Sequence, residues 1–198
     1  MRIENNYSVK AHNTFGINQI TKRFIEYRSA DEWKELLKSG KLEQPFFHIG
    51  AGSNLLFVDD YEGTLLHSAI CYIHPVKETK DEVWVSVGAG TCWDDFVAHC
   101  VEKEWYGVEN LSLIPGEVGS AAVQNIGAYG VEVKDLLVSL KAINLLTGEE
   151  REFSNAECQY DYRYSCFKQP EMKVWAVVEV TFKLSKQPTF NLTYKGLL

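Results

Sequence analysis

Several features that would mark a membrane, secreted or metal-binding protein are missing from this sequence of 198 residues. No run of ~18 apolar residues is present, and the first ten residues, MRIENNYSVK, lack the apolar core of a signal peptide. The five cysteines are odd in number and show no C-x-x-C spacing. We therefore expect a cytoplasmic protein with free thiols, rather than one with disulfides or a metal site.

Positive charge and nucleophile motifs are also scarce. The sequence has 20 Lys and Arg residues and 27 Asp and Glu residues, which gives a net charge of −7. This negative charge argues against nucleic acid or an anionic membrane as the main partner. Neither a Walker loop nor a G-x-S-x-G motif occurs. The histidines have no metal-ligand spacing, so we interpret them as structural residues: His12, His48, His67, His74 and His99.

The remaining composition, 45% hydrophobic and 24% charged, is that of an ordinary globular protein. A helix is predicted over 29–40, with Ser29 as its N-cap and Glu32 completing a capping box. A second helix is predicted after Thr91, which we assign as its N-cap with Asp94 three residues later. Apolar and alternating patterns predict strands at 23–27, 46–49, 63–71, 72–77, 83–87, 136–145, 151–153 and 174–184. Alternation in the last of these puts Val177 and Val180 on opposite faces.

This pattern predicts an α+β fold with two lobes. The first lobe would comprise residues 1–68 and contain one helix with several strands. The second would comprise residues 69–198 and contain the second helix with a mostly antiparallel sheet.

Glycine is concentrated in residues 114–130, IPGEVGSAAVQNIGAYG, called here the glycine-rich stretch. Glycine allows positive φ and lets the backbone approach a ligand, and free backbone N–H groups suit phosphates and heterocycle edges. Runs of Gly, Ala and Ser also occur in tight turns and where helices pack closely. Glycine content alone leaves both interpretations open.

Two Gly-x-Gly turns follow predicted strands. Residues 50–54, GAGSN, are called here the first glycine turn. They do not fit the dinucleotide motif, because Leu55 occupies the place of the third glycine and no helical pattern follows. An anion-binding nest of N–H groups and a plain turn between strands are equally compatible with this turn. Residues 88–90 are better explained as a simple entry into the second helix.

Arg163 is flanked by aromatic residues in the sequence YDYRYSCFK. A guanidinium in such a setting can clamp a carboxylate or polarise a carbonyl while its stem stacks on a ring. A solvated surface arginine is the other interpretation. The local sequence supports both.

Five stretches in order together resemble a known family: NTFGI (13–17), GAGSNLLF (50–57), GAGTCWDDFV (88–97), ENLSLIPGEVGSAAVQNIGAYG (109–130) and YDYRYSCFK (160–168). They closely resemble the UDP-N-acetylenolpyruvoylglucosamine reductases, flavoenzymes of bacterial peptidoglycan synthesis. The resemblance runs from Asn13 to Tyr194. It implies the two-lobed FAD-binding fold of the vanillyl-alcohol oxidase type. It also implies a reaction in which NADPH reduces FAD and the enolpyruvyl group of a nucleotide sugar is then reduced.

The resemblance also implies roles for individual residues. The first glycine turn would hold the FAD pyrophosphate: Gly50, Ala51, Gly52, Ser53 and Asn54. Residues that would line the flavin and adenosine portions are Ile114, Pro115, Gly116, Ser120, Val123, Gly127, Tyr129 and Val177. Arg163 would stabilise the substrate carboxylate as charge develops, which makes it both catalytic and substrate-binding, and Tyr194 would reach the substrate diphosphate. No metal is implied.

One departure from the family is large. Its members carry a C-terminal substrate-binding domain with a serine acid in a GNAGSFFKNP-like block and a late glutamate, and this sequence has neither block. We therefore expect the FAD-binding portion of such a reductase, inactive alone. The alternatives are an FAD-binding module without catalysis and another flavin oxidoreductase of the same fold.

Overall fold

The computed structural model describes residues 1–188, 190–192 and 194. Its first sheet has four strands in the order β1-β2-β4-β3, namely β1 (Arg2–Ser8), β2 (Ile20–Tyr27), β4 (Tyr61–Ser68) and β3 (Phe46–Ile49). β1 pairs antiparallel with β2, whereas β2 and β3 both pair parallel with β4. Helix α1 (Ala30–Lys38) connects β2 to β3.

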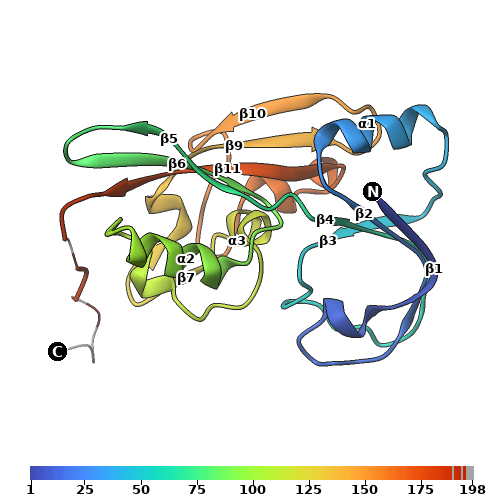
Figure 1. Ribbon diagram of the computed structural model, residues 1–198. Coiled ribbons are helices and arrows are strands. Elements are labelled where there is room, and N and C mark those ends of the chain that lie inside the picture. Colours follow the sequence, from blue (N-terminus) through green and yellow to red (C-terminus); the bar gives the residue numbers. More distant parts are fainter. Residues whose placement is uncertain (189, 193, 195–198) are drawn as a thin grey trace.

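The second sheet has five strands in the order β10-β9-β11-β6-β5, and every pair is antiparallel. Its members are β5 (Ile73–Glu78), β6 (Glu82–Gly88), β9 (Leu137–Asn144), β10 (Glu150–Ser154) and β11 (Trp175–Ser185). Helices α2 (Trp93–Glu102) and α3 (Val118–Gln124) lie together on one side of this sheet, and α1 lies at its other side (Figure 1).

Short elements complete the connections. A two-stranded ribbon joins β7 (Gly127–Ala128) to β8 (Val131–Glu132). The 3-10 segments are η1 (Val9–His12), η2 (Glu109–Leu111), η3 (Val133–Asp135), η4 (Cys166–Lys168) and η5 (Pro170–Met172). None of the helices in the described part of the chain is both long enough and apolar enough to cross a membrane.

Apolar side chains fill both sides of the five-stranded sheet. On one side Trp93 and Phe96 of α2 pack with Phe182 of β11 in the largest buried cluster. On the other side Trp33 of α1 packs with Val178 of β11, in a cluster that joins the two sheets. Burial of large apolar side chains is the main favourable contribution to folding, so the second sheet is the layer on which both helical groups are held.

The N-caps predicted for α1 and α2 have different outcomes. Ser29 caps α1 as predicted, because its Oγ accepts a hydrogen bond from the backbone N–H of Glu32 at 3.1 Å. The prediction that Thr91 caps α2 is wrong. Cys92 occupies the N-cap, and the Thr91 hydroxyl lies 3.3 Å from the backbone N and O of Tyr72. The Thr91 side chain, which the local sequence assigns to the helix cap, therefore contacts the backbone of Tyr72 instead.

Strict alternation along β11 is also wrong. Val177 pairs with Ala142 and Glu179 with Lys141, so the register shifts at Val178. A bulge of this kind leaves one residue unpaired and reverses the faces beyond it. Val177 consequently shares a buried cluster with Val180, while Val178 faces the α1 side.

Among the longer elements, strand β1 and helix α3 are absent from the sequence-based assignment. β1 is mostly exposed and polar, so it carries no apolar pattern. The α3 sequence VGSAAVQ consists mainly of small residues. Small residues provide little hydrophobic periodicity, so the sequence pattern does not distinguish this helix from a glycine-rich loop.

Candidate functional site

The first glycine turn leaves β3 and packs tightly on the segment before β2. Gly52 has a φ of +70°, and a Cβ built on it would lie 1.8 Å from the carbonyl oxygen of His12. No residue with a side chain fits this position without moving the backbone. As predicted, no helix follows the turn.

This turn meets the glycine-rich stretch, although 62 positions separate Ser53 from Pro115. The Ser53 hydroxyl donates a hydrogen bond to the carbonyl oxygen of Pro115 at 3.1 Å. A Cβ on Gly116 would lie 3.2 Å from Ser53 Oγ, and one on Gly50 would lie 3.1 Å from Ser120 Cβ. The two segments that the sequence singled out are therefore in contact, with the backbone of each against a serine side chain of the other.

Backbone donors are available at this contact. The N–H groups of Ala51, Gly52, Ser53 and Asn54 have no acceptor among the residues that the structure describes. Consecutive unpaired N–H groups in a turn form a concave site for anions. This observation fits a pyrophosphate-binding turn and does not fit a turn whose hydrogen bonds are all satisfied internally.

The start of α3 is held by its own side chains. Glu117 is the N-cap residue, and its backbone N–H donates to Ser120 Oγ at 3.2 Å. The Ser120 hydroxyl donates in turn to the Glu117 carbonyl oxygen at 2.8 Å. Ser120 thus fixes the local backbone beside Gly50.

A charged group also lies beside the first glycine turn. A Cβ on Gly50 would lie 3.1 Å from Oε2 of Glu117, whose Oε1 lies 2.8 Å from Nε2 of His67. The other ring nitrogen of His67 lies 3.3 Å from Glu26. Burial lowers the pKa of His67, but hydrogen bonds and charge from Glu117 and Glu26 outweigh this effect and raise the pKa above its ordinary value.

Arg163 reaches the glycine-rich stretch from a loop between β10 and β11. Its Nη2 donates to the carbonyl oxygen of Gly127 at 2.6 Å, and its guanidinium lies 5.9 Å from the ring centre of Tyr162. Its backbone has a φ of +52°, and its carbonyl accepts a hydrogen bond from Lys168 Nζ at 2.6 Å. The side chain is exposed, so the loop holds the arginine at an open edge of the site.

Asn125 is a site residue that the sequence analysis did not single out. It is wholly buried, adopts a left-handed φ of +45° at the C-cap of α3, and joins several segments. Its amide donates to the carbonyl oxygen of Asp161 at 2.9 Å and lies 3.2 Å from Glu132, while its Oδ1 accepts from the N–H of Lys134 at 3.1 Å. An Asn directly after a helical run and two residues before a glycine is the local signal of such a cap.

The remaining predicted residues fall into two groups. The rings of Tyr129 and Tyr194 meet edge to face with their centres 5.8 Å apart, which brings a predicted cofactor residue beside a predicted substrate residue. Ile114 and Val123 are partly buried against the cluster on the α2 side. Val177 is only 3% exposed and belongs to that cluster, so the structure gives it a packing contact, and its predicted contact with a cofactor stays a prediction.

The second Gly-x-Gly turn serves close packing. Cβ atoms on Gly88 and Gly90 would lie 2.2 Å from the carbonyl oxygens of Ile70 and Ser68. This contact lets the segment between the two sheets cross β6 at its end.

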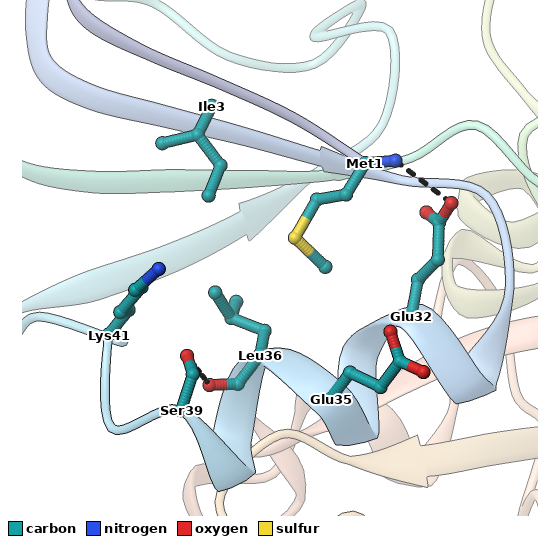
Figure 2. Close-up of a pocket in the computed structure, with 7 residues that line it drawn as sticks. All are labelled: Met1, Ile3, Glu32, Glu35, Leu36, Ser39 and Lys41. Atoms are coloured by element: carbon teal, nitrogen blue, oxygen red, sulfur yellow. Dashed lines mark hydrogen bonds and ion pairs between the residues drawn. The ribbon is translucent and has the colours of Figure 1, made fainter.

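Two hollows of the surface lie away from the contact between the first glycine turn and the glycine-rich stretch. One, of about 280 Å³, lies between β1 and α1 and is lined by Met1, Ile3, Glu32, Glu35, Leu36, Ser39 and Lys41, with the Met1 amino group paired with Glu32 (Figure 2). Another, of about 450 Å³, runs along α2. Neither is lined by a predicted site residue.

Comparison with known proteins agrees with the motifs. Residues 21–154 match the family described as FAD binding domain. A UDP-N-acetylenolpyruvoylglucosamine reductase of Bacteroides fragilis is 55% identical over 192 residues, which cover 97% of this chain and 58% of that relative. This chain therefore spans less than two thirds of the relative's length, and the predicted resemblance is confirmed over that part.

Solved structures agree as well. The crystal structure of the corresponding reductase from Thermus caldophilus has a TM-score of 0.76 and 26% identity, with 95% of this chain and 64% of that chain covered. An alkyldihydroxyacetonephosphate synthase has a TM-score of 0.59 and 13% identity, with 85% and 32% covered. At that identity only the fold is shared. These likenesses confirm the predicted α+β fold class of the vanillyl-alcohol oxidase type.

Proposed function

Because the chain belongs to the FAD binding domain family, we propose that it is the FAD-binding portion of a UDP-N-acetylenolpyruvoylglucosamine reductase. The observation that carries this proposal is the hydrogen bond from Ser53 to Pro115, which joins the first glycine turn to the glycine-rich stretch. Four N–H groups of the turn remain unpaired within the described residues at that contact. Backbone donors of this kind recognise phosphate oxygens without a cationic side chain.

The residues fit FAD by the shape of the backbone. The N–H groups of residues 51–54, that of Ser53 included, would bind the pyrophosphate, with the Asn54 amide as a side-chain donor, while the Ser53 hydroxyl donates to Pro115. Pro115, Gly116 and Ser120 would flank the adjoining part of the nucleotide. Ile114, Val123, Gly127, Tyr129 and Val177 complete the set proposed to line the cofactor. When bound, FAD supplies hydride transfer from NADPH to the enolpyruvyl double bond of the nucleotide sugar.

Arg163 is proposed to bind the carboxylate of the enolpyruvyl group. Its guanidinium is held at the edge of the glycine-rich stretch by Gly127, and its remaining N–H groups can form the bidentate contact that carboxylates favour. Negative charge that spreads onto the carboxylate during reduction would be stabilised there. Tyr194, which lies against Tyr129, is proposed to contact the substrate diphosphate.

Further features of the proposal rest on the family and the composition. We propose that the two sheets form separate cofactor-binding lobes divided near residue 68. Catalysis would need a substrate-binding domain outside this sequence. The reaction would belong to peptidoglycan precursor synthesis in the cytoplasm. NADPH and the nucleotide sugar would be the partners, with no nucleic acid and no membrane. The chain alone would bind FAD without turnover.

Flavin binding tests the proposal. The purified chain is expected to take up FAD with a shifted flavin absorption spectrum and quenched fluorescence, while riboflavin, which has no pyrophosphate, binds at least ~100-fold more weakly because the turn's N–H groups lose their partner. Equal binding of the two would contradict the assignment of the first glycine turn.

Reductase chemistry requires the longer protein. The parent protein is expected to bleach its flavin on anaerobic addition of NADPH and to reoxidise it with the enolpyruvyl substrate. Arg163→Ala should lower kcat ~10²–10³-fold, and Arg163→Lys should recover only part of it because the bidentate geometry is lost. Arg151→Ala, which removes another exposed arginine with an aromatic neighbour, is the matched control.

A further inference from the structure

A buried ion triad connects the two sheets beneath the first glycine turn. Its members are Glu26 on β2, His67 on β4 and Glu117 at the start of α3. Their side chains are 15%, 9% and 13% exposed, respectively. Glu26 and His67 belong to the four-stranded sheet, and Glu117 belongs to the helical layer of the five-stranded sheet.

The geometry determines the charge on the imidazole. Nε2 lies 2.8 Å from one carboxylate and Nδ1 lies 3.3 Å from the other. Ionised carboxylates only accept hydrogen bonds, and a neutral imidazole has a single N–H. Both contacts are therefore satisfied when His67 is an imidazolium, which also cancels one of the two negative charges.

The position of Glu117 gives this charge a consequence. Its carboxylate lies against Gly50 at the edge of the first glycine turn, where the proposed function puts a pyrophosphate. A carboxylate without a counter-charge would repel that anion strongly in a partly buried site. A neutral His67 would also lose one of its two hydrogen bonds, either the one to Glu26 within the first sheet or the one to Glu117 in the helical layer of the second.

We propose that His67 is a positioning residue whose protonated state holds Glu117 on the first sheet and neutralises it, so that FAD binds tightly only while His67 is charged. This inference rests on the proposed function. His67 would contact neither the reacting atoms nor the cofactor, and it acts through Glu117.

The other titratable and charged groups around the triad are His12, Arg2, His48, Tyr27 and Cys71. Burial, and then the charge of His67, lower the pKa of His12 to about 4 and that of His48 to about 3. Burial raises the pKa of Tyr27 and of Cys71. These shifts move His12, His48, Tyr27 and Cys71 away from neutral pH, whereas the pKa of His67 is raised, so His67 is the group of this set whose change of charge the experiment follows.

The direction of the pH effect follows. The pKa of His67 is raised in the folded protein, so the contribution of its charge is complete at pH values below the ordinary pKa of histidine and is lost as the pH rises through the folded value. Loss of the charge reduces the fraction of molecules competent to bind FAD, and the apparent Kd rises by the same factor.

The experiment measures the Kd of FAD for this chain by quenching of flavin fluorescence between pH 6 and 9. The wild-type Kd should rise at least about tenfold across this range, the ratio expected for loss of a charge-assisted hydrogen bond. His67→Gln should bind weakly at every pH and lose the pH dependence. His99→Gln, on α2 away from the triad, should behave as the wild type.

A double variant separates charge from packing. In His67→Gln the Glu117 carboxylate has no counter-charge, so adding Glu117→Gln should recover most of the lost affinity. A role in packing alone predicts that the second substitution weakens binding further. Circular dichroism of each variant confirms folding, and the wild-type pH profile tests the inference without any substitution.

Three results have distinct meanings. Wild-type protein that binds no FAD at pH 6 overturns the proposed function and this inference with it. FAD binding with a Kd that does not change across the pH at which the His67 resonance titrates overturns this inference alone. So does a His67 resonance that titrates below pH 6.5 by nuclear magnetic resonance of the free protein, because the triad then holds no imidazolium.

Discussion

The side-chain amide of Asn125 donates a hydrogen bond to the backbone carbonyl of Asp161 at 2.9 Å, two residues before Arg163. Ser165 strengthens the same connection, because its hydroxyl donates to the carbonyl oxygen of Val123 at 2.7 Å. With the contact between Arg163 and Gly127, these bonds make the arginine loop and the glycine-rich stretch one unit. The proposed cofactor site and the proposed substrate-binding arginine therefore depend on the same buried asparagine.

Replacing Asn125 tests this dependence. Asn125→Ala leaves the Lys134 N–H without its partner, removes one of the two hydrogen bonds that the Asp161 carbonyl accepts, and puts alanine at a left-handed φ. We expect the free energy of unfolding to fall by about 2–4 kcal/mol, measured by urea denaturation. Asn125→Gly removes the same hydrogen bonds, but glycine adopts the left-handed φ without strain. Its free energy of unfolding should therefore fall by about 1 kcal/mol less than that of Asn125→Ala. Equal stability of Asn125→Ala and wild type would show that the hydrogen bonds contribute nothing.

Gly52→Ala should disrupt the first glycine turn. The new methyl group would lie 1.8 Å from the His12 carbonyl oxygen, so the turn must move. We expect FAD affinity to fall by at least ~100-fold, because a displacement of about 1 Å is enough to lose aligned hydrogen bonds. Flavin fluorescence titration measures it.

Gly16→Ala is the matched control for that variant. Gly16 has a similar φ of +66°, but no atom lies within 4 Å of the added Cβ. Gly16→Ala should lower the stability only by the backbone strain of about 1 kcal/mol and leave the FAD affinity unchanged. Similar FAD affinities for both variants would argue against a steric requirement at Gly52.

Gly119→Ala sets helix propensity against packing. Alanine within a helix is favoured over glycine by about 1 kcal/mol, but the added Cβ would lie 2.7 Å from the Cβ of Ala89. Overpacking of this kind destabilises by about 1–3 kcal/mol, so we expect a net loss of stability on thermal unfolding. The pair Gly119→Ala with Ala89→Gly removes the clash and should recover part of the loss. A single variant more stable than wild type would show that α3 can move away from β6.

His48 should make the protein less stable in acid. It lies on β3 with its Nε2 2.9 Å from the Tyr27 hydroxyl. Burial, and then the charge of His67, lower the pKa of His48 to about 3. The unfolded chain therefore binds a proton that the folded protein refuses between pH 6.5 and about 3, and stability falls as the pH drops through this range.

The matched variant isolates this effect. In wild type, His48 should contribute up to about 1 kcal/mol per pH unit to the slope of unfolding free energy between pH 6.5 and 5. His48→Gln removes the titrating group but keeps a polar side chain beside Tyr27. The pH slope of the unfolding free energy of this variant should therefore be smaller by the His48 contribution. Urea denaturation at several pH values measures both slopes, and identical slopes would contradict a neutral His48.

The local sequence determined the elements whose signals are local. The cap at Ser29 and the strands from β2 to β6 follow from side chains that contact neighbours a few positions away. Gly52 and Gly116 also indicated close contacts, because the sequence shows where a side chain is missing even though it does not show which atoms approach that position. The aromatic neighbours of Arg163 marked it as a candidate, whereas its role as a substrate ligand and the choice of Tyr194 came from resemblance to a family.

Tertiary structure alone decided the rest. Thr91 contacts Tyr72 instead of capping α2, and a bulge in β11 reassigns Val177 to the other face. Glu26 and His67 are 41 positions apart, and His67 and Glu117 are 50 positions apart. No local periodicity encodes such contacts. Glu26 and His67 meet through the register of β2 with β4. The packing of the two sheets, driven by their apolar faces, then brings Glu117 to His67 in a space from which water is largely excluded.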